Sequence, residues 1–286
     1  GERRKLPILE NIKEGDSLIS GSEKELKLYF GKDWMERKTF DWQDEFSGVF
    51  KNDGFDVVIG NPPYIDSETM TKSQPEFRKY CAKTYSSAKG NWDLFCIFIE
   101  KGLNLLKRGG YFGMIVPNKL LSADYAEQIR RILEKYKIIS IRDYSSVSVF
   151  EASVYPIVII VKKESSEKKH NIKIESFGET GLRFSGEVSQ EKLKSYRKGW
   201  QLSFEKGVDF KFLDRNKSRI KLLKEICDVY GAATVSEAYE IKKILKEKNG
   251  QKDFFKFINT GTIDRYFSLW DGQHTRYLKS SYNKPI

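Results

Sequence analysis

The chain has 286 residues, enough for one large domain or two, and its 39% hydrophobic, 14% aromatic and 32% charged residues are typical of a globular protein. Lysine and arginine outnumber aspartate and glutamate by 51 to 40; this net charge of +11 favours a polyanionic partner, nucleic acid ahead of a membrane, and the alternative is a basic surface that serves only solubility. The sequence has no long apolar run, no signal-peptide pattern, no disulfide framework and no metal-ligand cluster, so we expect a cytoplasmic protein that spans no membrane and binds no metal.

Apolar runs alternate with helical patterns between residues 55 and 161. Four runs predict buried strands: "FDVVIG", "YFGMIVP", "KIISIRD" and "VYPIVIIVKK". Two amphipathic helices are predicted between them, one ended by Gly109 and Gly110 and one capped by Ser122. Strands that alternate with helices of this length indicate a doubly wound α/β domain, with a mostly parallel sheet covered on both faces.

After residue 162 the sequence becomes rich in charge and less periodic. We expect a helix over residues 218–230 and place a domain boundary near residue 222. Residues 1–222 then form one α/β domain. Residues 223–286 begin a second unit that is near the lower limit of size for an independent core.

The first predicted strand is followed by Asn61-Pro62-Pro63-Tyr64. Two prolines make a stiff turn without backbone donors, so this loop offers acceptors. The Asn61 side-chain oxygen and the Pro62 carbonyl can converge on one amino group, and the Tyr64 ring can stack on a planar ligand. Two acceptors on a conjugated amine favour a pyramidal nitrogen with a localised lone pair, which is stabilised further as the nitrogen attacks an electrophile.

The position of this tetrapeptide supports the same interpretation. Ligands of open α/β sheets bind at the carboxyl ends of the strands, and the loop follows such an end. The alternative is a rigid turn in which the tyrosine only packs. The combination of residue types and strand context favours a ligand site over this alternative.

The motif and its flanking stretches resemble the gamma-class adenine-N6 DNA methyltransferases of type II restriction-modification systems, in particular the single-chain, restriction-fused (type IIG-like) kind. "NPPY" is similar to their motif IV, "NIKEGDSLI" to motif III, "NWDLFCIFIEKGLNLLKRGGYFGMIVPNKLL" to motifs V and VI, and "VFEASVYPIVIIVKK" to motif VIII. The tail "INTGTIDRY" with "YLKSSYNKP" resembles the start of a target-recognition domain. The resemblance implies a Rossmann-like S-adenosylmethionine-dependent methyltransferase sheet over residues 1–222, followed by the start of that recognition domain over residues 223–286.

The resemblance also assigns roles to residues. Asn61 and the Pro62 carbonyl would hold the target amine, within the loop that Pro63 stiffens. Tyr64 would stack on an adenine swung out of double-stranded DNA, with Phe150 on its other side. The alternative for Phe150 is a core residue at the start of a strand.

Two further residues match the cofactor site of that family, together with Asn61. Asp16 would accept a hydrogen bond from the adenine amine of S-adenosylmethionine, and Phe98 would form an apolar wall beside it. The alternatives are a turn residue at "EGDS" for Asp16 and an ordinary core role for Phe98.

One expected motif is missing. The family's glycine-rich turn, which holds the methionine half of the cofactor, should precede Asp16, and no G-x-G occurs anywhere in the sequence. "GGYFG" opens a strand and lacks the helix N-terminus that such a turn requires. We therefore expect a fragment without the first strands of its sheet. An upstream segment would carry the cofactor motif and a nuclease domain, of which this chain has no signature.

The predicted function is methyl transfer from S-adenosylmethionine to the N6 amine of an adenine in double-stranded DNA. One alternative keeps the chemistry and changes the substrate to RNA or to a protein glutamine. Another alternative is an inert DNA-binding module. The recognition-domain-like tail and the basic charge favour DNA over protein as the substrate.

Overall fold

The computed structural model describes most of the chain before residue 205 and short pieces beyond it. The described residues are 11–149, 154–167, 169–195, 199–204, 215–216, 218–219, 221, 225–226, 254–256, 263–264, 267–268 and 277–279. The chain divides into two compact units, Gly1–Val208 and Asp209–Ile286. The boundary expected near residue 222 and the recognition-domain assignment of residues 223–286 stay predictions, and the helix expected over residues 218–230 lies largely outside the described residues.

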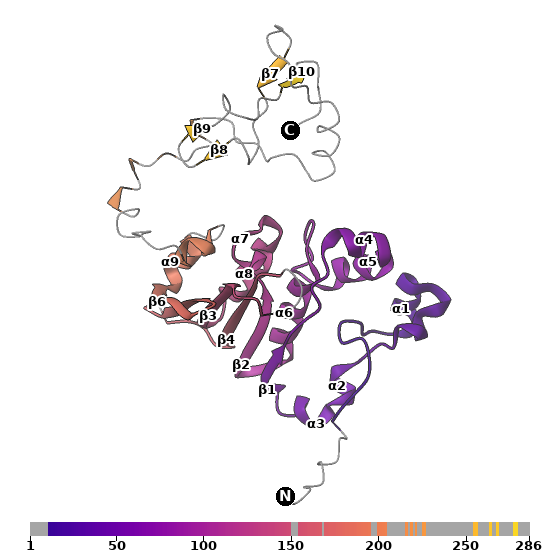
Figure 1. Ribbon diagram of the computed structural model, residues 1–286. Helices are drawn as coiled ribbons and strands as arrows, with labels where there is room; N and C mark the ends of the chain where they lie inside the picture. The colour runs from indigo at the N-terminus through magenta and orange to yellow at the C-terminus, as the bar shows by residue number, and fades with distance from the viewer. Residues whose placement is uncertain are drawn as a thin grey trace, which may run out of the picture. The chain divides into compact units, whose positions relative to one another are not determined.

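The first unit combines short helices with one mixed sheet (Figure 1). Its strands are β1 (Phe55–Gly60), β2 (Leu106–Pro117), β3 (Lys137–Ser146), β4 (Pro156–Lys162), β5 (Asn171–Gly178) and β6 (Gly181–Ser189). Its helices are α1 (Glu23–Phe30), η1 (Gly31–Arg37), α2 (Trp42–Glu45), α3 (Ser47–Phe50), α4 (Ser67–Ser73), α5 (Pro75–Thr84), α6 (Leu94–Leu105), α7 (Lys119–Ser122), η2 (Asp124–Ala126), α8 (Glu127–Leu133), α9 (Gln190–Ser195) and η3 (Trp200–Phe204). The α/β class predicted from the sequence is confirmed.

The sheet has the strand order β1-β2-β4-β3-β5-β6. β1 pairs with β2 in parallel, and so does β3 with β5. The pairings β2 with β4, β3 with β4, and β5 with β6 are antiparallel. The prediction of a mostly parallel sheet is therefore wrong.

The short connections explain this difference. A parallel pair needs a crossover of about a dozen residues or more. Only residues 147–155 separate β3 from β4, so β4 returns antiparallel to β3 and enters the sheet between β2 and β3. β5 and β6 form a hairpin whose ends pair at Gly178 and Gly181, and Gly181 takes a positive φ of 109° there.

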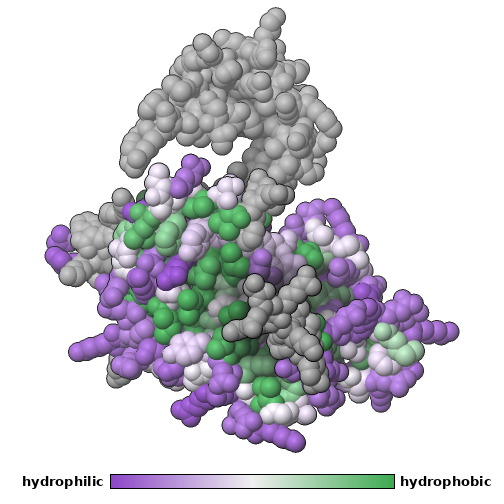
Figure 2. Space-filling model, turned by 60° about the horizontal axis from the view of Figure 1, so that its bottom comes forward, coloured by the Kyte–Doolittle hydropathy of each residue, from purple (hydrophilic) through white to green (hydrophobic). Residues whose placement is uncertain are grey.

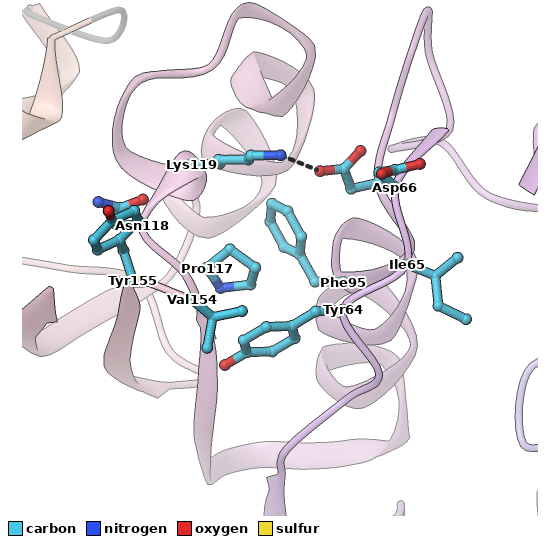
Figure 3. Close-up of a pocket in the computed structure, with 10 residues that line it drawn as sticks. Tyr64, Ile65, Asp66, Phe95, Pro117, Asn118, Lys119, Val154 and Tyr155 are labelled. Atoms are coloured by element: carbon cyan, nitrogen blue, oxygen red, sulfur yellow. Dashed lines mark ion pairs between the residues drawn. The ribbon is translucent and has the colours of Figure 1, made fainter. Parts of the chain in front are cut away.

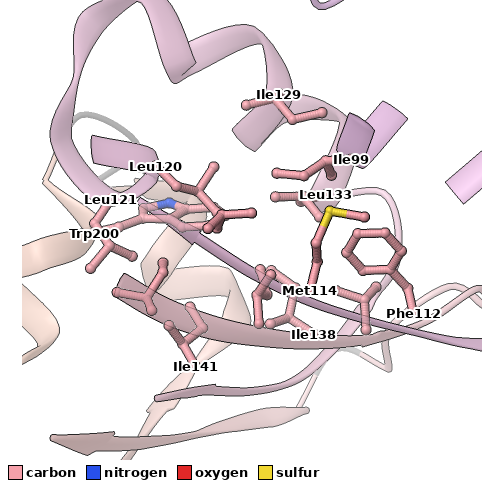
Figure 4. Packing of buried hydrophobic residues seen from close by; sticks show 14 of the residues in the cluster. Ile99, Phe112, Met114, Leu120, Leu121, Ile129, Leu133, Ile138, Ile141 and Trp200 are labelled. Atoms are coloured by element: carbon pink, nitrogen blue, oxygen red, sulfur yellow. The ribbon is translucent and has the colours of Figure 1, made fainter. Parts of the chain in front are cut away.

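One large apolar core holds the helices against the sheet. α6 contacts β1, β2 and α8, so α6 and α8 cover the same face. Figure 4 shows Ile99, Ile129 and Leu133 of the helices facing Met114 and Ile138 of the sheet. Because inward side chains recur at every second residue of a strand, alternate residues are buried in this core: Phe112, Met114 and Val116 of β2, and Ile157, Ile159 and Val161 of β4.

The opposite face of the sheet is open at β1 and β2. Val57 is 54% exposed, Ile59 80% and Tyr111 46%, although all three are large and apolar or aromatic. Figure 2 shows hydrophobic residues open to view across the middle of this unit, with hydrophilic residues around them. The expectation of a buried first strand and of a sheet covered on both faces is thus wrong for β1, which contacts α6 but leaves Val57 and Ile59 exposed.

The glycine pair predicted to end the first amphipathic helix has a different role. α6 ends at Leu105, and both glycines lie within β2. The β1–β2 register shifts here, from Phe55 opposite Leu106 to Val57 opposite Tyr111, and Gly109 has a φ of 79°. The pair therefore forms an irregularity in the strand, where a positive φ is required.

The expected cap of the second helix is also wrong. Ser122 is the last residue of α7, and α8 begins five residues later at Glu127, behind Ala126, which makes no side-chain capping bond. The second unit contains two small antiparallel ladders among its described residues. They pair β7 (Phe254–Lys256) with β10 (Tyr277–Lys279) and β8 (Ile263–Asp264) with β9 (Phe267–Ser268).

A close approach of α6 to the sheet gives a direct test of this packing. A Cβ at Gly102 would lie 2.7 Å from Phe112 Cε2 and 3.3 Å from Val58 Cγ1. We expect Gly102→Val to lower the free energy of unfolding by about 1–3 kcal/mol, as overpacked cores do. Urea denaturation checks this. Gly48→Ala is the matched control, because nothing lies within 4 Å of that position, and a Gly102→Val protein as stable as this control would contradict the packing.

Candidate active site

The carboxyl ends of β1 and β2 meet at one edge of the sheet because the two strands are parallel. β4 is antiparallel to β2 and starts at the same edge, where Pro117 pairs with Pro156. Three chain segments therefore converge there: the loop after β1, the loop after β2 and the approach to β4. This is the edge at which open α/β sheets hold their ligands.

The tetrapeptide that follows β1 forms the first of these segments. β1 ends at Gly60, and two consecutive prolines cannot donate to a strand ladder, so the pairing stops. Asn61 and Pro63 are exposed, Pro62 is buried and Tyr64 is half-buried. The loop thus keeps one proline packed in the protein while the amide of Asn61 faces solvent.

A cavity of about 260 Å³ lies between the three segments. Its walls come from the two loops, the approach to β4 and the start of α6, and they comprise Tyr64, Ile65, Asp66, Asp93, Phe95, Pro117, Asn118, Lys119, Val154 and Tyr155. Figure 3 shows Tyr64, Phe95, Pro117 and Val154 gathered side by side, whereas Ile65 points away from them. A largely apolar lining with a few polar groups is typical of a site for a small planar molecule.

The polar groups of the cavity lie at its rim. Asp66 caps α4 by accepting a 2.7 Å hydrogen bond from Thr69 N–H, which lowers the pKa of Asp66. Lys119 Nζ lies 3.6 Å from Asp93 Oδ2, a pair marked by the dashed line in Figure 3. The Asn118 amide donates to Ser145 Oγ at 3.1 Å. The rim therefore carries carboxylates, an ammonium group and a hydrogen-bonded amide, and these groups lie beside the aromatic side chains of the cavity.

A buried arginine holds the loop after β2 in place. Arg130 of α8 is fully buried, and its Nη1 donates to Leu120 O at 2.9 Å and to Ala123 O at 3.0 Å. Leu120 lies in α7 and Ala123 directly follows it, and the Ala123 carbonyl also accepts a 3.1 Å bond from Ala126 N–H. Arg130 thus holds the wall that carries Asn118 and Lys119 against α8.

Tyr64 keeps its proton at neutral pH. Burial raises the pKa of Tyr64 to about 12. A phenol with that pKa is not a general base, so the ring, as a stacking surface, is what this residue offers.

Asp16 and Phe98, the predicted cofactor residues, lie close to one apolar cluster. Asp16 Oδ1 accepts a 3.0 Å bond from Leu18 N–H, so the carboxylate closes a turn, and burial raises its pKa. Phe98 on α6 is half-buried and packs against the cluster that contains Leu18 and Ile19. The contacts of Asp16 therefore support its alternative role as a turn residue. Those of Phe98 support its alternative role as a core residue.

The remaining site predictions have different outcomes. Phe150 lies outside the described residues, so its stacking on the face of the base opposite Tyr64 stays a prediction. In the part of the chain that the structure describes, no group of histidine, cysteine, aspartate or glutamate is arranged to hold a metal ion. Within the same part, no helix has the length and apolar character needed to cross a membrane.

Several cavity residues were not predicted from the sequence: Asp93, Phe95, Asn118, Lys119, Val154 and Tyr155. A signal for two of them was present. "NKLL" follows β2 as "NPPY" follows β1, and the ends of neighbouring parallel strands lie together. The other residues depend on the position of α6 and on the antiparallel return of β4.

Comparison with known proteins identifies the family. The model of the Eco57I restriction-modification methylase family matches residues 4–150, just over half of the chain. The chain belongs to this family. The recognition made from the sequence is thereby confirmed at the level of a restriction-modification methylase.

Curated relatives carry names of the same kind. The chain is 29% identical over 175 residues to the type II restriction enzyme and methyltransferase RM.Eco57I of Escherichia coli, covering 60% of this chain and 16% of that protein. It is 32% identical over 130 residues to the type II methyltransferase M.BstVI of Geobacillus stearothermophilus, covering 44% of this chain and 22% of that protein. The chain thus spans less than a quarter of the length of either relative.

Among solved structures, the chain is similar to the type IIG restriction endonuclease BpuSI. The sequence identity is 17%, the TM-score is 0.40, and the match covers 52% of this chain and 21% of that one.

The burial of Tyr64 can be measured by titration. The absorbance difference between the wild-type protein and Tyr64→Phe isolates the phenolate of this residue among 15 tyrosines. Because burial disfavours the charged form, we expect a midpoint near pH 12, instead of the ordinary value near 10. A midpoint near 10 would mean that the ring leaves the cavity and is solvated.

Proposed function

We propose that the chain forms part of a DNA methyltransferase of a restriction-modification system. The reaction is transfer of a methyl group from S-adenosylmethionine to the N6 amine of an adenine flipped out of double-stranded DNA, in the cytoplasm. The family membership supports methyl transfer in this setting. The observation that carries the proposal is that the Asn-Pro-Pro-Tyr loop ends a strand beside an aromatic cavity at the ligand-binding edge of the sheet.

Two acceptors of this loop would act on the amine. The Asn61 side-chain oxygen and the Pro62 carbonyl would accept hydrogen bonds from its two hydrogens. This arrangement favours a pyramidal nitrogen whose lone pair is available to attack the methyl carbon of the sulfonium. The interaction strengthens as the transition state is approached, so it lowers the barrier of the chemical step.

The aromatic cavity would hold the extruded base. A flipped base needs a flat apolar partner to replace the stacking that it loses in the duplex. The neutral ring of Tyr64, with Phe95 and Pro117 near it, provides such a surface. Phe150 would contact the other face of the base.

S-adenosylmethionine would be held in part by this chain. Its adenine amine is a donor, and the Asp16 carboxylate is an acceptor that lies next to an apolar cluster with Phe98 at its margin. We propose that these residues would contact the adenine half of the cofactor. Its sulfonium supplies an activated methyl group, and Asn61 holds the nucleophile that receives it.

Other segments of the protein would complete the system. We propose that another segment of the whole protein supplies the glycine-rich turn for the methionine half of the cofactor, and that a nuclease domain belongs to the same protein. Residues 223–286 would begin the domain that reads the DNA sequence. The excess of lysine and arginine would contact the phosphate backbone, which provides affinity without sequence preference.

The experiment that tests the function uses the protein expressed from its complete gene. Transfer of labelled methyl from S-adenosylmethionine is measured with duplex DNA, RNA and protein as acceptors, and the methylated base is identified by mass spectrometry. N6-methyladenine in DNA is the expected product. Label in RNA or in protein glutamine would replace this proposal with the first alternative, and no transfer to any acceptor would favour an inert DNA-binding module.

We expect Asn61→Ala to lower kcat for DNA methylation by about 100- to 1,000-fold, the usual cost of losing one hydrogen bond that is made in the transition state. DNA affinity should change only a few fold, because the amide acts in the chemical step. Single-turnover kinetics and DNA titrations separate the two effects.

Asn91→Ala is the matched control, because Asn91 is also an exposed asparagine and does not belong to the loop that follows β1. It should methylate DNA at the wild-type rate. An Asn61→Ala enzyme with near wild-type turnover would rule out the role of this amide.

A further inference from the structure

Asp93 occupies a capping position but does not cap its helix. Asp41 and Asp66 precede α2 and α4, and both accept hydrogen bonds from the first-turn N–H groups, as aspartate at this position usually does. Asp93 precedes α6 in the same way, and its side chain makes no such bond. Its carboxylate is therefore engaged elsewhere.

The carboxylate of Asp93 joins two loops that are far apart in sequence. Oδ1 accepts a 3.1 Å hydrogen bond from the N–H of Ser67, three residues after Tyr64. Oδ2 accepts a 2.5 Å bond from the Tyr125 hydroxyl and lies 3.6 Å from Lys119 Nζ. Only 7% of Asp93 is exposed, so these bonds are made largely away from water, where they are stronger.

The two loops are the two walls of the cavity. Ser67 starts α4 directly after the wall that contains Tyr64 and Asp66, and Lys119 belongs to the wall that follows β2. The neighbouring backbone reinforces the first attachment, since Leu94 N–H donates to Ile65 O at 3.0 Å. The start of α6 is thus hydrogen-bonded to the segment just after the tetrapeptide. Through Asp93 it also contacts the opposite wall.

We propose that Asp93 is a positioning residue for the reaction, one that sets the distance between the two walls and thereby the placement of Tyr64 against the target base. This inference rests on the proposed function. The carboxylate suits the task because it has acceptors on both oxygens and can serve two donors at once. Tyr125 remains a donor in this arrangement, because burial raises the pKa of its hydroxyl.

Three variants separate the hydrogen bonds from the charge. Asp93→Ala removes both bonds. Asp93→Asn keeps an acceptor for Ser67 N–H and offers an amide donor to the Tyr125 oxygen, so it loses only the charge that faces Lys119. Tyr125→Phe removes the hydrogen bond to η2, and it leaves the bond to Ser67 and the ion pair with Lys119.

We expect Asp93→Ala to lower kcat for DNA methylation about 100-fold, the scale of effect seen when reacting groups are misplaced by about 1 Å. Tyr125→Phe should lower kcat about tenfold, and Asp93→Asn should remain within about threefold of the wild type. KM for S-adenosylmethionine and the affinity for DNA should change only a few fold in all three. Emission of 2-aminopurine at the target position should change in Asp93→Ala and recover in Asp93→Asn.

Asp33→Ala is the control, because Asp33 is an exposed aspartate on η1, outside the cavity lining. A wild-type kcat in Asp93→Ala would overturn the inference, and so would an Asp93→Asn enzyme as slow as Asp93→Ala. If Asp93→Ala does not fold, Tyr125→Phe decides, and a wild-type kcat in that variant overturns the inference.

A measurement without catalysis distinguishes failure of the inference from failure of the proposed function. Hydrogen exchange of the amides of residues 65–67 and 119–125 should accelerate in Asp93→Ala and stay unchanged in Asp33→Ala. A wild-type protein that methylates no DNA would end the proposed function, and the exchange data would still decide whether Asp93 ties the walls. Unchanged exchange in Asp93→Ala would show that it does not.

Discussion

The parallel pairing of β1 with β2 is the constraint on which the site depends. It brings the ends of both strands to one edge, so the loops at Asn61 and at Asn118 face each other although 57 residues separate them in the sequence. The start of α6 lies beside both loops, since the N–H of Leu94 and the carboxylate of Asp93 bond to residues after the first loop. The apolar face shared by α6, α8 and the sheet fixes this geometry, and the cavity results from the strand ends that the core aligns.

The polar groups around the cavity are organised by the same packing. A buried arginine satisfies carbonyls at the end of α7, and a nearly buried aspartate serves donors from two loops. Hydrogen-bond partners drawn from different segments restrict how those segments move. In contrast, the amide of Asn61 is exposed. The site thus combines walls that are held by buried hydrogen bonds with an exposed asparagine at the end of β1.

The sequence predicts the strand and helix types of the first unit well, because their periodicity reflects which side chains meet the core. It does not predict how the strands pair. The apolar run of β4 is compatible with a parallel or an antiparallel partner, and the short connection after β3 decides between them. The run of β1 indicated burial on both faces, yet Ile59 is 80% exposed, because burial depends on which elements cover a strand.

The tetrapeptide at the end of β1 could be found from the sequence because its chemistry lies in four adjacent residues. Asp93 could not be recognised in this way. An aspartate before a helix predicts a cap, and its actual bonds to Ser67 and Tyr125 require knowledge of which loops lie beside the start of α6.

The central claim is that the edge formed by β1 and β2 binds the target amine. A structure of the protein from its complete gene, bound to duplex DNA and a non-reactive analogue of S-adenosylmethionine, tests it most directly. We predict an adenine outside the duplex with its amine within about 3 Å of the Asn61 side-chain oxygen and the Pro62 carbonyl, and its ring against Tyr64. An extruded base held at another edge of the sheet, or a duplex with no base extruded, would contradict the account.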